Sequence, residues 1–265
     1  MTPITTRTDF SISSRSAPIA IVAAMQQELH ALLQSLDDVH IEAYAGRDFH
    51  VGHLQGRPVV LVLSRIGKVA AATTAALLIG RYGIERMVFV GVAGGLGAGV
   101  RVGDVVVATE LLQHDMDASP LFPRHEVPLT GKARFATDAD LSRALAQATE
   151  QVLADPHAAF GPEAAALGVI VPRLHCGLIV SGDRFVATAA ESEALRAELP
   201  DALAVEMEGA ALAQVCHDCA VPFAVLRIVS DRADDSAHVD FLQFIDVVAA
   251  RTSAAIVTRW ARTQA

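Results

Sequence analysis

The stretch Ala204-Val205-Glu206-Met207-Glu208-Gly209 decides how we interpret the rest of the chain. Two carboxylates flank a methionine between an apolar run of strand length, 202–205, and the start of an alanine-rich helical pattern. Ligands of open α/β sheets bind outside the carboxyl ends of the strands, which is where this junction would lie. A helix N-terminus that merely favours negative charge explains the same pair. Whether the two acids belong to a ligand site or only to a helix N-terminus therefore has to be decided from the residues that other strands bring to this edge.

Strand and helix patterns alternate outward from this junction. Apolar runs of strand length lie at 19–24, 59–63, 87–92, 105–109, 177–180, 202–205 and 223–229. Helical patterns lie at 25–36, 69–82, 138–153, 188–199, 210–219 and 240–260. A hairpin is expected across 46–63, a loop at 91–99 and a peripheral connection at 155–172. The pattern predicts a three-layer α/β/α fold with a largely parallel mixed central sheet.

Length and composition predict one soluble domain. The chain has 265 residues, of which 52% are hydrophobic and 19% charged, and a formal net charge of -9. We place the domain at 18–265, after a flexible Thr- and Ser-rich tail at 1–17. The acidic balance argues against nucleic acid as a partner, because neutralising phosphates requires clustered Lys and Arg. No apolar run approaches the roughly 20 residues that span a membrane, and the tail lacks the apolar segment of a secretory signal.

The cysteines and histidines predict neither disulfides nor a metal site. Three cysteines, Cys176, Cys216 and Cys219, cannot build a disulfide framework for this length, which favours a reducing cytoplasm. The C-x-x-C spacing at 216–219 lies inside a helical pattern and indicates reduced, packed thiols. His114-Asp115-Met116-Asp117 has the residue types of metal ligands, but a hydrogen-bonded turn or a subunit contact is favoured. We expect no metal and no cofactor.

The glycine-rich segment 91–99 suggests a phosphate-binding loop, but its context does not fit one. The segment does not match G-x-G-x-x-G in register, lacks the Gly-Lys-Ser/Thr of a P-loop, and leads through 101–104 into another strand. We expect its missing side chains to let the backbone approach a flat ligand closely.

Residues typical of functional sites follow several predicted strands. Glu28 follows the first strand, Phe185 follows the strand at 177–180, and Glu206, Glu208 and Asp231 follow the last two. The carboxyl ends of parallel strands meet at one edge, so these groups can converge. Several carboxylates beside an apolar and aromatic wall suit acid/base chemistry on an uncharged polar molecule.

Several sequence blocks together resemble the motifs of 5'-methylthioadenosine/S-adenosylhomocysteine nucleosidases, which belong to the wider purine nucleoside phosphorylase superfamily. The blocks are Ala24-Met25-Gln26-Gln27-Glu28, Ile66-Gly67-Lys68-Val69-Ala70, Ala93-Gly94-Gly95, Val102-Gly103-Asp104, Gly177-Leu178-Ile179-Val180-Ser181-Gly182-Asp183, Val205-Glu206-Met207-Glu208 and Ser230-Asp231. The resemblance implies a phosphorylase/hydrolase-like fold. It also implies hydrolysis of the N-glycosidic bond of methylthioadenosine, S-adenosylhomocysteine and 5'-deoxyadenosine, in a cytoplasmic homodimer.

The resemblance also implies a role for each site residue. The catalytic residues would be Glu28 as the base that activates water, Glu208 as the ligand of the ribose hydroxyls and Asp231 as the proton donor to adenine N7. The substrate-binding residues would be Met25, Ala93, Gly94, Phe185, Val186, Glu206, Met207, Arg227, Ser230 and Phe241. Among these, Glu206 and Arg227 would help at the water, Phe185 would stack on adenine and Ser230 would orient Asp231.

Three other functions stay open at the level of sequence. A phosphate-dependent nucleoside phosphorylase would need cationic donors, for which Arg65 and Arg124 are candidates. A non-catalytic nucleoside-binding protein would be expected to lack a catalytic carboxylate, whereas the three acids are present. A nucleosidase for another 5'-modified nucleoside, such as a futalosine type, is compatible with the same acids.

The chain departs from the family pattern at Val92, where Ser or Thr is common, at Gln26 and Gln27, where acids are common, and at the loop 119–128. In this family, the corresponding loop of the partner subunit closes over the 5'-substituent. The loop difference therefore leaves the preferred 5'-substituent open.

Overall fold

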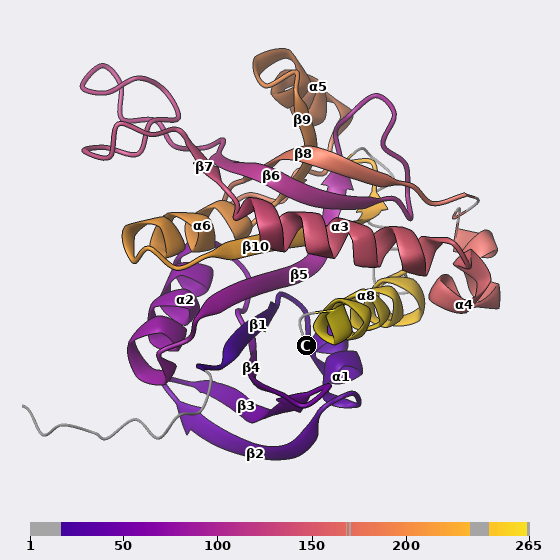
Figure 1. Ribbon diagram of the computed structural model, residues 1–265. Helices are drawn as coiled ribbons and strands as arrows, with labels where there is room; N and C mark the ends of the chain where they lie inside the picture. Colours follow the sequence, from indigo (N-terminus) through magenta and orange to yellow (C-terminus); the bar gives the residue numbers. More distant parts are fainter. Residues whose placement is uncertain (1–16, 168, 170, 234–243, 264–265) are drawn as a thin grey trace, which may run out of the picture.

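The computed structural model describes residues 17–167, 169, 171–233 and 244–263 (Figure 1). Residues 1–16 of the expected tail at 1–17, the first residues, 240–243, of the expected C-terminal helix and, among these, Phe241 lie outside the described residues.

The strands are β1 (Ile19–Ala23), β2 (Asp37–Tyr44), β3 (Arg47–Leu54), β4 (Arg57–Leu63), β5 (Arg86–Gly95), β6 (Val105–Gln113), β7 (Arg134–Ala136), β8 (Leu174–Ser181), β9 (Ala202–Glu206) and β10 (Phe223–Asp231). The helices are α1 (Gln26–Leu33), α2 (Lys68–Tyr82), α3 (Ala139–Leu153), α4 (Pro156–Phe160), α5 (Ala189–Glu198), α6 (Gly209–Asp218) and α8 (Ala250–Thr263). A 3-10 turn, η1 (Pro162–Leu167), follows α4, and a π-helical turn, η2 (Ile245–Ala249), leads into α8.

One mixed sheet of ten strands forms the centre of the fold. Parallel pairs join β4, β1, β5 and β10 in one group, and β6, β8 and β9 in another. Antiparallel pairs of β10 with β6 and of β5 with β9 connect the two groups, so five strands close into a ring in the order β10-β6-β8-β9-β5. At the other end of the sheet, the hairpin strands β4 and β3 lead to the edge strand β2. The expected largely parallel mixed sheet is confirmed.

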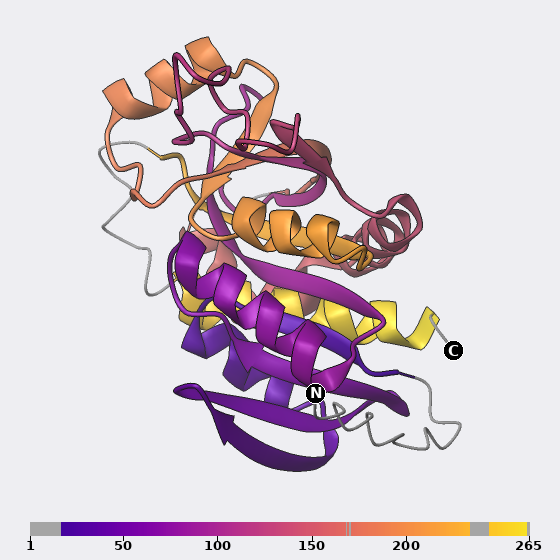
Figure 2. The same cartoon turned by 90° about the vertical axis from the view of Figure 1, so that its left-hand side faces the viewer.

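Helices cover both faces of the sheet, as expected for three layers (Figures 1 and 2). Apolar residues of α1, α3 and α8, including Leu32, Leu145 and Trp260, pack in one core with β1, β4 and β10. Apolar residues of α2 and α6, including Leu78 and Leu212, pack in a second core on the opposite face. Helix α5 packs against β8 and β9 in a third, smaller core. No described helix combines the length and apolar character needed to cross a membrane.

Two expectations about secondary structure were wrong, and the edge strand β2 was missed. Strand β5 continues through Gly91–Gly95, where a loop was expected, because the missing side chains make room for neighbours: a Cβ on Gly91 would lie 3.1 Å from the guanidinium of Arg227. The segment 155–172 is not merely peripheral, since it contains α4, whose Phe160 is buried in the core. Strand β2 was not anticipated, although Val39, Ile41 and Ala43 alternate with polar residues; its side chains are almost all exposed, because it lies at the edge of the sheet.

Candidate active site

The carboxyl ends of β1, β5, β8, β9 and β10 open onto one pocket. All the predicted site residues that the structure describes line it, apart from Glu28 and Arg227, which lie buried behind its wall. The described lining residues are Ala24, Met25, Ile66, Val92, Ala93, Gly94, Arg184, Phe185, Val186, Val205, Glu206, Met207, Glu208, Ser230 and Asp231. The sequence interpretation gave no site role to Ile66, Arg184, Val205 or Ala24. Ala24, Ile66 and Val205 belong to quoted motif blocks and Arg184 directly follows one, and that placement was the available signal.

Glu28 lies in the first turn of α1, directly after β1. The Met25 amide at the start of the helix donates a 3.1 Å hydrogen bond to Glu28 Oε2, which fixes the carboxyl group. The side chain is fully buried, and its Oε1 has no hydrogen-bond partner. Burial raises the pKa of Glu28 to about 7, although the positive charge of Arg227 opposes the rise. A carboxyl group poised near neutral pH, with one oxygen free to accept a proton, suits a general base.

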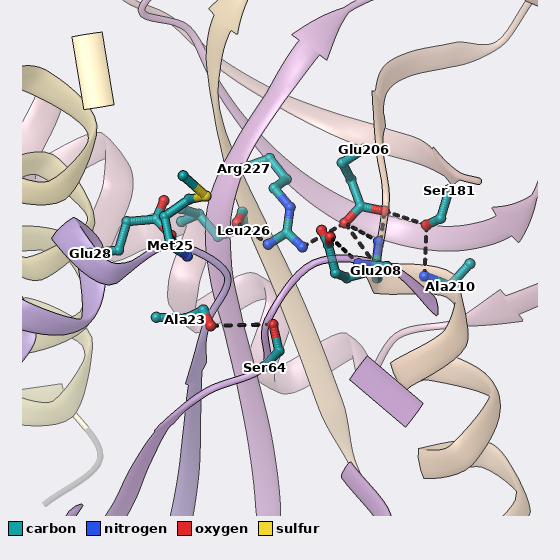
Figure 3. Close-up of polar contacts among 12 residues, drawn as sticks. Ala23, Met25, Glu28, Ser64, Ser181, Glu206, Glu208, Ala210, Leu226 and Arg227 are labelled. Carbon is teal, nitrogen blue, oxygen red and sulfur yellow. Dashed lines mark hydrogen bonds and ion pairs between the residues drawn. The ribbon is translucent and has the colours of Figure 1, made fainter. Parts of the chain in front are cut away.

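Arg227, on β10, lies between Glu28 and the two acids of the opening stretch (Figure 3). Its guanidinium lies over the ring of Phe89, 4.1 Å from the centroid, and fills the space left by Gly91. Nη2 donates a 2.6 Å bond to Glu206, and Nη1 donates a 3.1 Å bond to the carbonyl oxygen of Leu226. The arginine is fully buried, so its charge is held in a low-dielectric setting where it acts strongly on nearby carboxylates.

Glu206 fixes the start of α6 and does not project freely into the pocket. Its carboxylate accepts bonds from the amides of Glu208, at 3.1 Å, and Gly209, at 2.8 Å. It also accepts from the Ser181 hydroxyl, which in turn accepts a 2.8 Å bond from the Ala210 amide (Figure 3). With the bond from Arg227, four donor groups hold this carboxylate, which makes it the anchor that ties β8, β10 and α6 together.

Glu208 has a different environment two residues further on. The amide of Gly67, just before α2, donates a 2.9 Å bond to its Oε1. Burial, followed by the nearby negative charge of Glu206, raises the pKa of Glu208 to about 7, and Arg227 opposes the rise. Of the two acids at this junction, Glu208 is therefore the one with fewer fixed donors and a carboxyl group directed at the pocket.

Asp231 ends β10 on the far side of the pocket. The Ser230 hydroxyl donates a 2.8 Å bond to Asp231 Oδ2, and the Ala233 amide donates a 2.8 Å bond to Oδ1. Gly94 on β5 leaves room for this arrangement, because a Cβ there would lie 3.0 Å from Oδ1 and 2.9 Å from the Ala233 side chain. The structure thus brings Ser230 and Asp231 together, and it directs the carboxyl group toward the same cavity as Glu208.

An apolar wall faces these acids. Phe185 lies in the loop between β8 and α5 and is 40% exposed, whereas its neighbour Val186 is buried. Met25, Val92 and Met207 continue the apolar lining. An aromatic ring at the mouth, with aliphatic and thioether groups deeper in, is suited to a flat heterocycle joined to a moderately apolar group.

The cations needed for a phosphate co-substrate are engaged elsewhere. Arg65 donates to the carbonyl oxygen of Gly46, and Arg124 pairs with Glu198 and Asp117. Arg184 is the one arginine among the described lining residues, and it pairs with Glu191 in an exposed position. The described part of the pocket therefore has an acidic and apolar wall, which disfavours a phosphate dianion.

The other sequence features do not line the pocket. Within the described ranges, no three His, Cys, Asp or Glu side chains are grouped as metal ligands. Asp115, of the His-Asp-Met-Asp stretch, pairs with Lys68 at 2.6 Å. All three described cysteines are free, but only Cys216 is buried; the expectation of packed thiols at 216–219 was wrong for Cys219, which is exposed. Cys219 is exposed because it lies at the C-terminal end of α6.

Comparison with known protein families assigns the chain to a protein superfamily. A family model described as the phosphorylase superfamily matches residues 18–262. The fold and the acid-lined pocket thus define a phosphorylase-superfamily protein.

Individual relatives of the chain identify one family within this superfamily. The chain is 36% identical over 227 residues to a 5'-methylthioadenosine/S-adenosylhomocysteine nucleosidase from Shewanella denitrificans, covering 86% of this chain and 91% of that protein. It is 36% identical over 240 residues to a nucleosidase of the same name from Bacillus cytotoxicus, covering 90% and 96%. The crystal structure of the Neisseria meningitidis enzyme with methylthio-immucillin-A superposes with a TM-score of 0.80 at 36% identity, covering 94% of this chain and 100% of that one. The chain belongs to the 5'-methylthioadenosine/S-adenosylhomocysteine nucleosidase family.

Proposed function

We propose that this protein is an N-glycosyl hydrolase that cleaves 5'-methylthioadenosine and S-adenosylhomocysteine, and also 5'-deoxyadenosine, to adenine and the 5'-substituted ribose. The observation that carries the proposal is an acidic and apolar pocket with two carboxyl groups, Glu208 and Asp231, in its wall and a third, Glu28, buried behind it. The named relatives, which match over nearly their whole length, support the choice of substrates.

Glu28 acts as the general base on water. Its unbonded Oε1 accepts a proton from the water as the water oxygen attacks C1' of the ribose. With a pKa of about 7, the carboxyl group is ionised in a large fraction of molecules at neutral pH, yet remains basic enough to take the proton. Arg227 lies beside this carboxyl group and favours its charged form, because the positive charge opposes the effect of burial.

Glu208 binds the ribose hydroxyls and stabilises the positive charge that develops on the sugar as the bond to adenine breaks. A carboxylate already fixed in a buried pocket acts on this charge without reorganising during the reaction. Glu206 does not share this task directly, because its oxygens accept from the backbone, Ser181 and Arg227. It keeps Glu208 and Arg227 at their positions.

Asp231 protonates N7 of the leaving adenine, so that the electron pair of the broken C1'–N9 bond is received by a neutral base. The Ser230 hydroxyl and the Ala233 amide orient its carboxyl group. Phe185 stacks on the purine, and the buried Val186 lies at the adenine edge. The acid and the base thus work on separate parts of the substrate, in the way that inverting glycosidases keep acid and base apart around a water molecule.

We further propose that the enzyme is a cytoplasmic homodimer that works without a metal or an organic cofactor and without nucleic acid. Three free cysteines support a reducing compartment. Ile66, at the pocket wall, and Val69, in the first turn of α2, are 60% and 77% exposed, and Leu121, in the loop after β6, is 84% exposed. Large exposed apolar side chains, one of them at the pocket wall, support a second subunit that covers them.

The test is turnover of methylthioadenosine, S-adenosylhomocysteine, 5'-deoxyadenosine, adenosine and inosine in phosphate-free buffer, with release of the base followed. We expect release of adenine from the first three, and no increase when phosphate is added. Absence of release from every adenosine derivative would overturn the proposal. Formation of ribose-1-phosphate derivatives only when phosphate is present would instead identify a phosphorylase.

A further inference from the structure

A polar cluster that no site role accounts for lies directly behind Glu208. Its members are Lys68 at the start of α2, Asp115 after β6 and Asp183 after β8, and we call it the Lys68–Asp115–Asp183 cluster. Lys68 Nζ donates a 2.6 Å bond to Asp115 Oδ1, and the Asp183 amide donates a 2.9 Å bond to Asp115 Oδ2. The Lys68 amide donates a 2.7 Å bond to Asp183 Oδ1. Each member therefore contacts both of the others, and none lines the pocket.

The cluster meets the site through two consecutive amides. The Lys68 amide is bonded to Asp183, and the preceding amide, that of Gly67, is bonded to Glu208. Two adjacent N–H groups at the start of a 15-residue helix are thus each directed at a different carboxylate. The orientation of the first amide depends on that of the second, because the two share one short turn.

The turn needs an external anchor. Gly67 adopts φ 97° and ψ 158°, a conformation that is essentially restricted to glycine. The start of α2 has no side-chain cap of its own, and Asp183, from a different element, supplies the missing acceptor. A Cβ on Gly67 would lie 3.2 Å from Asp183 Oδ1, so the aspartate is packed closely against the turn it holds.

We propose that Asp183, braced by Asp115 and Lys68, is a positioning residue that keeps the Gly67 amide on Glu208 and so sets the ionisation of the sugar-facing carboxylate. The inference rests on the proposed function, in which Glu208 must be ionised to hold the ribose and stabilise its developing charge. It extends the functional site to three residues that do not touch the substrate.

The other charged groups that face Glu208 belong to β9 and β10, which carry no member of the Lys68–Asp115–Asp183 cluster. Glu206, from β9, raises the pKa of Glu208, and Arg227, from β10, lowers it. Asp231, also from β10, lies across the same pocket. The Gly67 amide from α2 lowers the pKa of Glu208, since a donor stabilises the ionised form. Loss of Asp183 would therefore act on Glu208 through this amide.

The decisive variant is Asp183→Ala, compared with Asp183→Asn. Alanine removes the acceptor for the Lys68 amide, whereas the asparagine carbonyl oxygen can still accept it. We expect the acid limb of the pH profile of kcat/KM to move up by about one pH unit in Asp183→Ala, because a donor to the carboxylate is weakened. The loss should be about tenfold near pH 6 and small above pH 8, with Asp183→Asn restoring most of the activity.

A matched control separates this effect from the loss of a helix cap in general. Asp138 accepts a 2.8 Å bond from the Leu141 amide at the start of α3, remote from the pocket. Asp138→Ala removes the same kind of bond, so it should lower the melting temperature to a similar degree without moving the pH profile. Equal acid limbs in the wild type and Asp183→Ala would overturn the proposal, as would an equal shift in Asp138→Ala.

A second measurement tests the proposal independently of turnover. Carbon-13 NMR of protein labelled at the glutamate carboxyl groups, with the Glu208→Gln protein assigning the signal, follows the titration of Glu208 directly. A higher pKa in Asp183→Ala supports the proposal, and an unchanged pKa overturns it. If the wild type releases no adenine, the proposed function fails, while the NMR titration still decides whether Asp183 controls the charge of Glu208.

Discussion

The two sides of the pocket differ in how they are held. On the sugar side, Glu28 and Arg227 are fully buried, and Glu206 accepts from four donor groups. On the base side, Phe185 is 40% exposed, in a loop at 182–188 that connects β8 to α5. In the proposed function, the side that holds the ribose is thus fixed before substrate arrives, whereas the side that holds the purine presents a partly exposed aromatic ring. Charged side chains that are already fixed in position can stabilise a charge that develops during the reaction. Stacking of a planar ring requires only apolar contact, which a partly exposed aromatic side chain provides.

This difference predicts that mutations on the sugar side have the larger effects, on both rate and stability. On the base side, mutations should mainly weaken binding. The following experiments test the contrast, from the largest expected effect to the smallest.

Replacing Glu28 by Gln should give the largest loss of rate. The amide keeps the size of the side chain but cannot take a proton from water, so kcat should fall by about 10²–10⁴-fold. Binding of a non-hydrolysable nucleoside analogue, measured by calorimetry, should change little. Turnover comparable to that of the wild type would refute the role of Glu28 as base.

Replacing Arg227 by Met should destabilise the fold most. The substitution removes the only cation bonded to Glu206 among the described residues and leaves a buried carboxylate uncompensated, which typically costs about 3–5 kcal/mol. Denaturant unfolding at pH 7.5 measures this free energy. Arg134 is the matched control, since its pairs with Asp201 and Glu110 are surface-exposed and Arg134→Met should cost about 0–1 kcal/mol. A similar loss of unfolding free energy in both variants would show that the buried ion pair of Arg227 is no more important for stability than the exposed pairs of Arg134.

Glu28 should also make stability depend on pH in a direction opposite to that of a salt-bridged acid. Its pKa is about 7 in the folded protein and 4.5 is the ordinary value, so the folded state binds more protons between these values. Stability should therefore fall as pH rises from about 4.5 to 7. Glu28→Gln removes this dependence and should be more stable than the wild type at pH 8 by on the order of 2–3 kcal/mol, with no such gain at pH 4.5. Thermal melts of both proteins at the two pH values provide the measurement.

Replacing Phe185 by Ala should have the smallest effect on the fold and a moderate one on binding. Loss of a stacked base typically costs about 1–3 kcal/mol, so KM should rise by roughly tenfold or more, while the melting temperature changes little because the ring is partly exposed. Phe185→Tyr keeps the aromatic face and should bind nearly as well as the wild type. A large drop in the melting temperature of Phe185→Ala would show that the base side is as rigid as the sugar side.

The sequence was sufficient to predict the layers and the convergence of the acids. Glu28, Glu206 and Asp231 stand at or shortly after the ends of apolar strand runs. Parallel pairing of β1, β5 and β10 brings Glu28 and Asp231 to one edge, and the antiparallel contact between the ends of β5 and β9 adds Glu206. The family resemblance supplied the roles proposed for them. From the sequence, only that resemblance could assign different roles to Glu206 and Glu208. Their environments differ because Glu206 accepts hydrogen bonds from Ser181 on β8 and Arg227 on β10, whereas Glu208 accepts one from the Gly67 amide before α2.

The features that were missed depend on contacts between distant segments. The Lys68–Asp115–Asp183 cluster joins residues 47 and 115 positions apart, so their separate motif segments gave no sign that the three side chains meet. The glycine run of β5 was interpreted as a loop from propensity alone, whereas the guanidinium of Arg227 requires the space at Gly91. Local pattern could not reveal either requirement, since each is set by a neighbour in space.

Closure of five strands into a ring has a consequence for aggregation. Strands inside the ring have both neighbours in the same molecule, so they cannot recruit a strand from another chain. In the described part of the main sheet path, β2 is the edge left at the opposite end, and it exposes Val39, Ile41 and Tyr44. Three acids on the same strand, Asp37, Asp38 and Glu42, discourage intermolecular pairing by charge repulsion. Low pH protonates these acids and high salt screens them, so either condition would weaken the charge repulsion at β2. Substitutions on β2 can therefore improve colloidal stability without altering the active site.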